Sequence, residues 1–212
     1  VLMELRARFD EDNNILWSSK LEEAGCKILY GFDYYKTHCK VCLITRVDSR
    51  GNINYISQVA TGNYNEKTAK LYTDFSLMTA NEAIGQDAKD LFDNIMLGNL
   101  EGEYKNLLVS PKSMQEGLER LINEQIEVQK KTGNGYIRLK LNSISDRKVI
   151  DKLSEASNEG VEIIMLVRGV CCILPGVKNR TENIQVYSVV GRFLEHHRIC
   201  LLYTSPSPRD RG

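Results

Sequence analysis

The sequence predicts a mixed α/β fold in which each half of the chain builds a largely parallel sheet. Short apolar segments typical of strands alternate with segments of helical periodicity along most of the 212 residues. The positions between them carry glycine, asparagine and aspartate, which end helices and form turns. Strands that alternate with helices of this length are typical of parallel sheets.

The first half is expected to open with a strand over residues 1–9, where apolar and polar side chains alternate and Arg8 falls near the carboxyl end. The acidic and amide residues that follow can cap a helix from Ile15 to Ala24, and a second helix ends at Gly98. The other elements expected in this half are strands at 26–30, 41–46 and 54–59 and the second helix at 82–97.

The second half is expected to begin after residues 98–103, a stretch rich in glycine, asparagine and glutamate. The two predicted domains therefore span residues 1–103 and 104–204. Pro111 can open a long amphipathic helix that stops at the glycines of residues 133–135. The elements expected after it are a strand at 136–142, a helix at 147–158 and a strand at 161–167.

Both ends of the chain indicate that it is part of a longer protein. Met3 lies inside the first strand-like segment, so we expect the chain to begin within a fold. Residues 205–212 read Ser-Pro-Ser-Pro-Arg-Asp-Arg-Gly and interrupt an apolar strand without structural logic. We interpret them as a non-native tail.

Composition excludes several classes of protein. The 28 basic and 28 acidic residues give a net charge of zero, so no nucleic-acid partner is expected and any anion site must be local. No apolar run approaches the ~20 residues of a transmembrane helix. Cys39 and Cys42 form a Cys-x-x-Cys, but residues three apart on a strand point to opposite faces and chelate a metal poorly. We interpret all six cysteines as reduced core residues of a cytoplasmic protein.

The three histidines fall in two matching motifs, His38 within Lys36–Lys40 and His196 with His197 within Glu195–Arg198. In each motif a cationic residue lies two positions from a histidine. Upstream of each motif an arginine ends a predicted strand, and the sequence separation from Arg8 to His38 is nearly equal to that from Arg168 to His196. Ligands of α/β sheets collect at the carboxyl ends of strands. This duplication predicts a phosphate-handling site that is built twice.

The chemistry of these residue types suits phosphoryl transfer. On a strand, Lys36, His38 and Lys40 would share one face, where the lysines hold phosphate oxygens while the imidazole attacks phosphorus. Arg8 and Arg168 add planar forks that bind two phosphate oxygens at once. Each histidine taken alone is at least as compatible with a structural role as with a catalytic one. Only the joint pattern of histidines, lysines and arginines favours a functional site.

Three further features are weaker signals. The Thr61–Asn63 turn can aim backbone N–H groups at an anion, although a Gly-Asn pair by itself usually marks an ordinary turn. Tyr72 is, on the pattern alone, more typical of a core or a turn than of a ligand site. Trp17 lies on an apolar helix face and is expected in the core.

Seven segments, taken together, resemble the bacterial polyphosphate kinase family. The resemblance runs in order from residue 1 to about residue 203. The segments are Arg6–Glu11, Lys36–Lys40, Thr61–Ala69, Leu71–Asp74, Leu139–Ser143, Leu166–Gly169 and Arg192–His196.

The resemblance implies two phospholipase-D-like α/β domains, both incomplete here, with a shared active-site cleft. It implies an enzyme that moves the terminal phosphate of ATP reversibly onto inorganic polyphosphate with Mg²⁺, and that forms homo-oligomers. His38 would become phosphorylated, and His196 rather than His197 would assist proton transfer.

The resemblance also assigns ligand contacts. Tyr72, Arg168 and His196 would contact ATP, and Arg8 would match a residue at the magnesium and phosphate site. From charge and placement we add Lys40, Asn63 and Lys140 as phosphate-binding candidates.

Departures from the family pattern limit what this chain is expected to do alone. A histidine that some members carry before the Thr-Gly-Asn turn is Gln58 here, and the region with the adenine-site asparagine is absent. We therefore expect an enzyme as the parent protein and an inactive isolated chain. Two alternatives stay open. The first is a phospholipase-D-type phosphodiesterase or nuclease, although those hydrolases usually have an aspartate where this chain has Thr45. The second is a protein that only binds polyphosphate.

Overall fold

The computed structural model describes residues 1–4, 11–32 and 34–202. Contacts divide the chain into two compact units, and neither unit is continuous in sequence. The first unit comprises residues 1–58 and 78–107, and the second comprises residues 59–77 and 108–212. A segment from the middle of the first sequence half thus belongs to the second unit.

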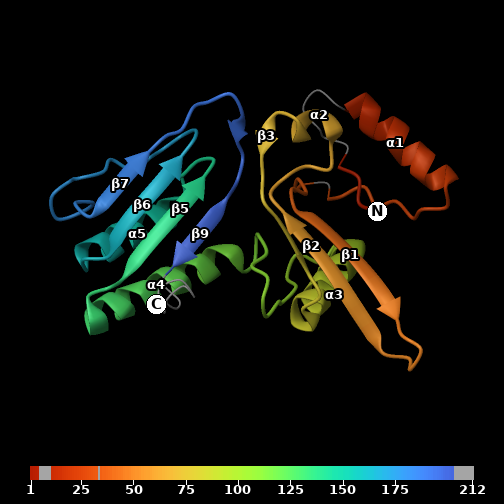
Figure 1. Ribbon diagram of the computed structural model, residues 1–212, viewed down its shortest axis with the longest axis horizontal. Helices are drawn as coiled ribbons and strands as arrows, with labels where there is room; N and C mark the ends of the chain where they lie inside the picture. Colours follow the sequence, from red (N-terminus) through yellow and green to blue (C-terminus); the bar gives the residue numbers. More distant parts are fainter. Residues whose placement is uncertain (5–10, 33, 203–212) are drawn as a thin grey trace, which may run out of the picture. The chain divides into compact units, whose positions relative to one another are not determined.

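The first unit contains a β-hairpin covered by a helix. Strands β1 (Lys40–Val47) and β2 (Ile53–Ala60) run in opposite directions in Figure 1, and β4 (Ser76–Thr79) lies on the other side of β2. The hairpin turn closes because the Asp48 carboxylate accepts hydrogen bonds from the backbone N–H groups of residues 50 and 52.

Helix α3 (Glu82–Met96) packs on this hairpin. Asn81 caps its N-terminus by accepting a hydrogen bond from the backbone N–H of Ile84 at 3.1 Å. Gly85 allows the helix to approach β2, because a Cβ atom at that position would overlap the side chain of Tyr55. Gly98 ends the helix in the left-handed conformation, at φ 67°.

The second unit is a four-stranded sheet of order β7-β6-β5-β9. Strands β5, β6 and β7 are parallel, and β9 runs antiparallel to β5 at the edge (Figure 1). The elements are α4 (Met114–Thr132), β5 (Tyr136–Leu141), α5 (Arg147–Asn158), β6 (Glu162–Val167), β7 (Ile184–Tyr187) and β9 (Ile199–Leu202).

The apolar core of the second unit lies between one face of the sheet and the helices α4 and α5, which contact each other. Alternate residues of β5 and β6, such as Ile137 and Met165, point into it and are fully buried. Ile122 and Leu153 supply the helix side of the same core. The carboxyl ends of β5 and β6 are thereby fixed side by side, with Leu141 paired to Val167.

A two-stranded parallel sheet completes the second unit. It joins β3 (Tyr72–Thr73) to β8 (Leu194–Glu195), segments that are far apart in sequence. The short helix α2 (Glu66–Ala69) precedes β3, and Asn65 caps it by accepting from two backbone N–H groups.

The expected α/β class is confirmed at the level of a mixed fold with three small sheets. The expected parallel sheet is found in the second unit, whereas the first unit has an antiparallel hairpin because the tight turn at residues 48–52 reverses the chain. Residues 26–30 form only an isolated bridge at Leu29 rather than a strand. Helix α1 spans Glu11–Glu23, so the acidic residues expected as its cap form its first turn.

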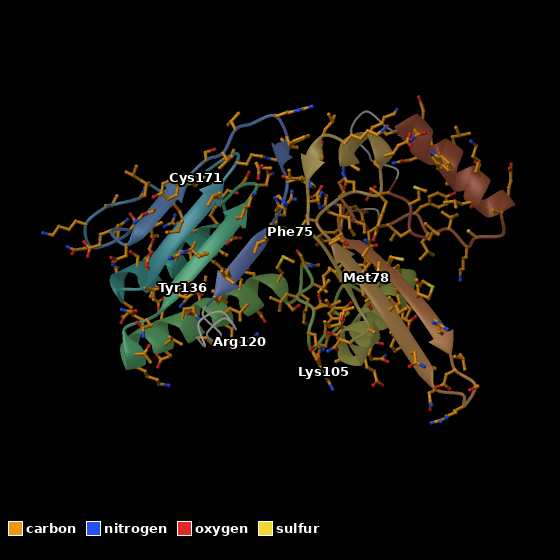
Figure 2. The ribbon with its side chains drawn as sticks, in the orientation of Figure 1. Phe75, Met78, Lys105, Arg120, Tyr136 and Cys171 are labelled. Carbon is orange, nitrogen blue, oxygen red and sulfur yellow. The ribbon has the colours of Figure 1, made fainter. Side chains whose placement is uncertain are left out.

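Two burial predictions are wrong. Trp17 is 50% exposed, with the ammonium of Lys20 over its ring at 4.9 Å. The six cysteine thiols are free, and five of them are exposed, including Cys171, which Figure 2 labels. Within the described ranges, no helix combines the length and apolar character required to cross a bilayer.

Candidate functional site

The pairing of β3 with β8 creates the centre of the candidate site in the second unit. The parallel register places Tyr72 opposite Leu194 and Thr73 opposite Glu195. The backbone N–H of His196 continues the ladder by donating to Thr73 O at 3.1 Å. One step beyond each strand, this register brings Asp74 beside His196.

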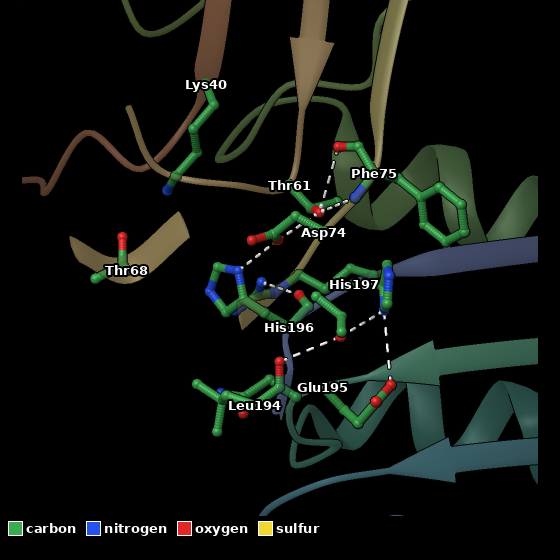
Figure 3. Close-up of polar contacts among 12 residues, drawn as sticks. Lys40, Thr61, Thr68, Asp74, Phe75, Leu194, Glu195, His196 and His197 are labelled. Carbon is green, nitrogen blue, oxygen red and sulfur yellow. Dashed lines mark hydrogen bonds and ion pairs between the residues drawn. The ribbon is translucent and has the colours of Figure 1, made fainter. Parts of the chain in front are cut away.

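The buried His196 pairs with the partly buried carboxylate of Asp74. The distance from His196 Nδ1 to Asp74 Oδ1 is 2.7 Å, and His196 is 7% exposed (Figure 3). A carboxylate oxygen accepts, so Nδ1 carries the hydrogen and Nε2 is the nitrogen left for chemistry. The ring of Tyr72 lies against the imidazole, with ring centroids 4.9 Å apart.

The Thr61–Asn63 turn supports the carboxylate of this pair. Thr61 Oγ1 donates to the same Asp74 Oδ1 at 2.8 Å, and Gly62 lies so close that a Cβ atom there would meet Asp74 side-chain atoms at 3.0 Å. Asn63, predicted to bind phosphate, is exposed in the same turn. The turn therefore holds Asp74 in place for His196.

His197 has different surroundings from its neighbour. Its ring contacts Phe75 at a centroid distance of 4.4 Å, and its Nδ1 lies 2.9 Å from Lys140 Nζ. Burial and then the charge of Lys140 lower the pKa of His197. A lysine ammonium only donates, so His197 is neutral near pH 7 with its hydrogen on Nε2.

Lys140, predicted to bind phosphate, is also paired with the Glu195 carboxylate. The hydrogen bond from Lys140 lowers the pKa of Glu195. The Lys140 ammonium thus ties β5 to the end of β8 and holds His197 against the same strand ends. Its charge already has a carboxylate partner.

Arg168 follows the last residue of β6, as the sequence predicts. Its guanidinium donates to Asn142 Oδ1 at the end of β5 and, at 3.5 Å, to the backbone oxygen of Glu195. The strand ends therefore direct Arg168 toward the peptide that precedes His196.

In the first unit, His38 and Lys40 lie at the start of β1. Lys40 Nζ donates to His38 O at 2.6 Å and lies 3.1 Å from His38 Nδ1. The Glu4 carboxylate accepts a hydrogen bond from the backbone N–H of Thr37 at 2.9 Å and so holds the segment that leads into β1. Only Lys40 is in the strand, which begins at that residue, so the prediction that Lys36, His38 and Lys40 share one strand face is wrong.

The structure gathers four predicted site residues, Tyr72, Lys140, Arg168 and His196, around the ends of β3, β5, β6 and β8. His38 and Lys40 belong to the first unit. Arg8 lies outside the described residues.

Sequence reasoning missed Asp74 and Asn142, although both stand in segments that carry the family resemblance. Their roles depend on long-range strand pairing, for which single residues give no local signal.

Two family models match the chain, and together they account for most of it. The model described as polyphosphate kinase C-terminal domain 1 matches residues 1–100, and that described as polyphosphate kinase C-terminal domain 2 matches residues 107–209. The two regions are thus consecutive C-terminal domains of one kinase class. The chain belongs to the polyphosphate kinase family.

Individual relatives agree with this family assignment. The polyphosphate kinase of Bacillus cereus is 46% identical over 199 residues, and that of Exiguobacterium sibiricum is 48% identical over 199 residues. Each alignment covers 94% of this chain and 28% of the relative, so the chain spans little more than a quarter of those proteins. The crystal structure of polyphosphate kinase from Porphyromonas gingivalis superimposes with a TM-score of 0.81 at 40% identity, covering 95% of this chain and 33% of that one.

Proposed function

We propose that this chain is the phosphoryl-transfer region of an enzyme that moves the terminal phosphate of ATP reversibly onto inorganic polyphosphate. The observation that carries this proposal is the Asp74–His196 pair beside the guanidinium of Arg168, in a chain of the polyphosphate kinase family. An oriented imidazole and a cationic fork provide proton handling and charge stabilisation, the main requirements of phosphoryl transfer.

In this proposal His38 is the nucleophile. An imidazole nitrogen forms a bond to the terminal phosphorus of ATP while the bond from that phosphorus to the ADP oxygen breaks, and the proton on the other ring nitrogen passes to water. The terminal oxygen of a polyphosphate chain then attacks the phosphorus and breaks the P–N bond, and the released ring takes a proton back from water. Lys40, which contacts both the ring and the carbonyl of His38, is placed to neutralise phosphate oxygens as they arrive.

His196 handles the proton in this scheme, and Asp74 orients it. With Nδ1–H donated to Asp74, Nε2 can take a proton from the polyphosphate oxygen and, once protonated, can give a proton to the departing ADP oxygen in the reverse sense of the cycle. Tyr72 and Arg168 are proposed to contact ATP, and Asn63 and Lys140 remain phosphate-binding proposals. The phospholipase-D-like architecture, the shared cleft, the cytoplasmic location and the homo-oligomer stay predictions.

Magnesium fits this proposal as an ion carried by the phosphates of ATP rather than by a protein cage. Across residues 1–4, 11–32 and 34–202, no group of three or more His, Cys, Asp or Glu side chains is arranged to hold a metal ion. Mg²⁺ commonly binds through one or two carboxylates and substrate phosphates. Arginine is not a metal ligand, so Arg8 at such a site would bind phosphate oxygens, and no step above depends on the ion.

Phosphohistidine labelling tests the proposal. A full-length polyphosphate kinase in which the matching region has been exchanged for this chain is incubated with ATP labelled at the terminal phosphate. We expect an acid-labile, base-stable protein adduct that disappears in His38→Ala and persists in His197→Gln. Retention of the label by His38→Ala contradicts the assignment of the nucleophile.

A further inference from the structure

The hydroxyl group of Thr61 joins the backbone of Phe75 to the carboxylate of Asp74. Thr61 Oγ1 accepts a hydrogen bond from Phe75 N at 3.0 Å and donates one to Asp74 Oδ1 at 2.8 Å (Figure 3). The two backbones are also paired, because Thr61 N donates to Phe75 O at 2.9 Å. The position of the hydroxyl oxygen is therefore set by the backbone on both sides of it.

These contacts also fix the direction of the hydroxyl hydrogen. Since Phe75 N–H donates to Oγ1, the hydrogen of Thr61 is left for an acceptor, and two oxygens lie within reach: Asp74 Oδ1 at 2.8 Å and Phe75 O at 3.5 Å. The carboxylate oxygen is nearer, and a carboxylate accepts a stronger hydrogen bond than a peptide carbonyl. Threonine has few χ1 rotamers, so the hydroxyl group stays aimed at Asp74.

The oxygen that Thr61 contacts is the one that meets His196. Asp74 Oδ1 lies 2.7 Å from His196 Nδ1, and the Asp74 side chain is 21% exposed, so water competes for its oxygens. The torsion that rotates a carboxyl group is broad, so an unsupported carboxylate turns readily. Gly62 lies against the other oxygen, because a Cβ atom there would be 3.0 Å from Asp74 Oδ2. The Thr61 hydroxyl and Gly62 thus hold the two oxygens from different sides.

We infer that Thr61 is a positioning residue for phosphoryl transfer, which acts through Asp74 to keep the hydrogen of His196 on Nδ1 and to leave Nε2 for proton exchange. The inference rests on the proposed function for the reaction that His196 serves. It extends the chain of groups that orients this imidazole from the carboxylate to the backbone of Phe75.

NMR of the imidazole nitrogens in the 212-residue chain tests the first half of the inference. We expect His196 to be in the Nδ1–H form in the unmodified chain. Thr61→Val keeps the shape of the side chain and removes the hydroxyl, so the carboxylate should turn toward water and His196 should become a mixture of both tautomers. Thr61→Ser keeps the hydroxyl and should keep the Nδ1–H form. A pure Nδ1–H form in Thr61→Val overturns the inference.

Thr132→Val is the matched control for loss of a threonine hydroxyl. The Thr132 hydroxyl donates to Val128 O at the end of α4, and its side chain is exposed. Its removal should leave the tautomer of His196 unchanged. A change in Thr132→Val equal to that in Thr61→Val would mean that the spectrum reports general loosening of the unit, and it would overturn the inference.

Turnover tests the second half, in a full-length polyphosphate kinase whose matching region has been exchanged for this chain. Thr61→Val should lower kcat by about tenfold and leave the KM for ATP within about twofold, because the proton-handling group is misplaced but not removed. Thr61→Ser should stay within about threefold of the unmodified kcat. A raised KM with an unchanged kcat would mean that Thr61 serves binding, and this result overturns the positioning role.

A double-mutant cycle with Asp74→Asn separates positioning from general support of the fold. If Thr61 acts only through the carboxylate, Thr61→Val should cost little further kcat once Asp74→Asn is present. A purely structural role would add its full loss to that of Asp74→Asn. Additive losses therefore overturn the inference.

Two further arrangements make every outcome decisive. If Thr61→Val does not fold, Thr61→Ala takes its place in each measurement, and an intact Nδ1–H form of His196 in that variant overturns the inference. The imidazole spectrum is recorded without ATP, so it is independent of the phosphohistidine step. Failure of the inference leaves the label and the turnover of Thr61→Val intact. Failure of the proposed function removes the label but leaves the tautomer of His196 dependent on Thr61.

Discussion

His196 and His197 are adjacent in the chain, yet their partners impose opposite hydrogen positions. His196 donates through Nδ1 to the Asp74 carboxylate, and His197 accepts at Nδ1 from the Lys140 ammonium. This difference supports the choice of His196 as the proton-handling group on physical grounds. A neutral His197 whose Nδ1 faces a lysine is suited to hold structure rather than to exchange protons.

The imidazole of His197 should therefore take up a proton less readily in the folded chain than in the unfolded chain. Because its pKa is lowered, the unfolded chain takes up a proton that the folded chain does not, so folding stability should fall as pH drops below about 6.5. Lys140→Met removes one cause of the shift but leaves burial, so the pKa of His197 should rise part of the way toward its ordinary value. ¹⁵N NMR titration of the three histidines measures this, and an unchanged His197 pKa in Lys140→Met would contradict it.

Asp87 is a buried acidic residue whose hydrogen bonds allow a prediction about stability. The residue is 5% exposed, and its carboxylate accepts hydrogen bonds from the backbone N–H groups of residues 105, 106 and 107. Burial acts to raise the pKa of Asp87, but these hydrogen bonds outweigh it and lower the pKa. The carboxylate thereby fixes the segment that follows α3.

Asp87→Asn should destabilise the chain by about 1–3 kcal/mol, since an amide cannot accept all three hydrogen bonds in the same geometry. Urea denaturation measures the loss, with Asp90→Asn on the exposed side of α3 as a control expected within about 0.5 kcal/mol. The contribution of Asp87 should disappear as pH falls below about 3.9, because the folded-state pKa is lowered. Equal stability of the two variants would show that the Asp87 contacts contribute nothing.

At the scale of elements, the bounds of a helix or strand could be predicted from the sequence where local interactions determine them. Helix α5 spans the predicted Arg147–Asn158, since Asp146 accepts from the backbone N–H of Val149 and a glycine follows the end. Strands β5 and β6 agree within one residue, because their apolar residues face one core. Two-residue strands such as β3 and β8 carry no periodicity, and only the fold brings them together.

The contact between α3 and β2 shows how an element can depend on one small residue. Replacing a glycine inside a helix by alanine ordinarily stabilises the helix by about 0.5–1 kcal/mol. At Gly85 the added methyl group would overlap the side chain of Tyr55, so we expect Gly85→Ala to destabilise by about 1–3 kcal/mol. Thermal and urea unfolding measure the sign, which distinguishes the two effects.

Gly191→Ala is the control for that substitution, because no atom lies within 4 Å of the position of a Cβ at residue 191. It should change stability by no more than about 0.5 kcal/mol. A stabilising Gly85→Ala would mean that α3 does not pack on Tyr55 in the way described.

At the scale of the whole molecule, the compact units do not follow the sequence halves. Residues 59–77 lie in the first half of the chain but supply β3, Thr61 and Asp74 to the second unit. A division near residue 103, which composition favours, separates Asp74 from His196. The sequence alone places the histidines and arginines in motifs. It could not show that residues 59–77 complete the site, because strand pairing between distant segments leaves no local pattern.

Dividing the chain at that boundary tests the role of the inserted segment. Residues 104–212 alone retain α4, α5, the four-stranded sheet and the apolar core, so we expect them to keep protected amides in β5 and β6. They lack Asp74, so the Nδ1–H signal of His196 should be lost. A peptide of residues 59–77 added in excess should restore the signal, whereas the same peptide with Asp74→Asn should not. If His196 keeps its Nδ1–H form without the peptide, β3 does not orient it, and the site is formed by the second sequence half alone.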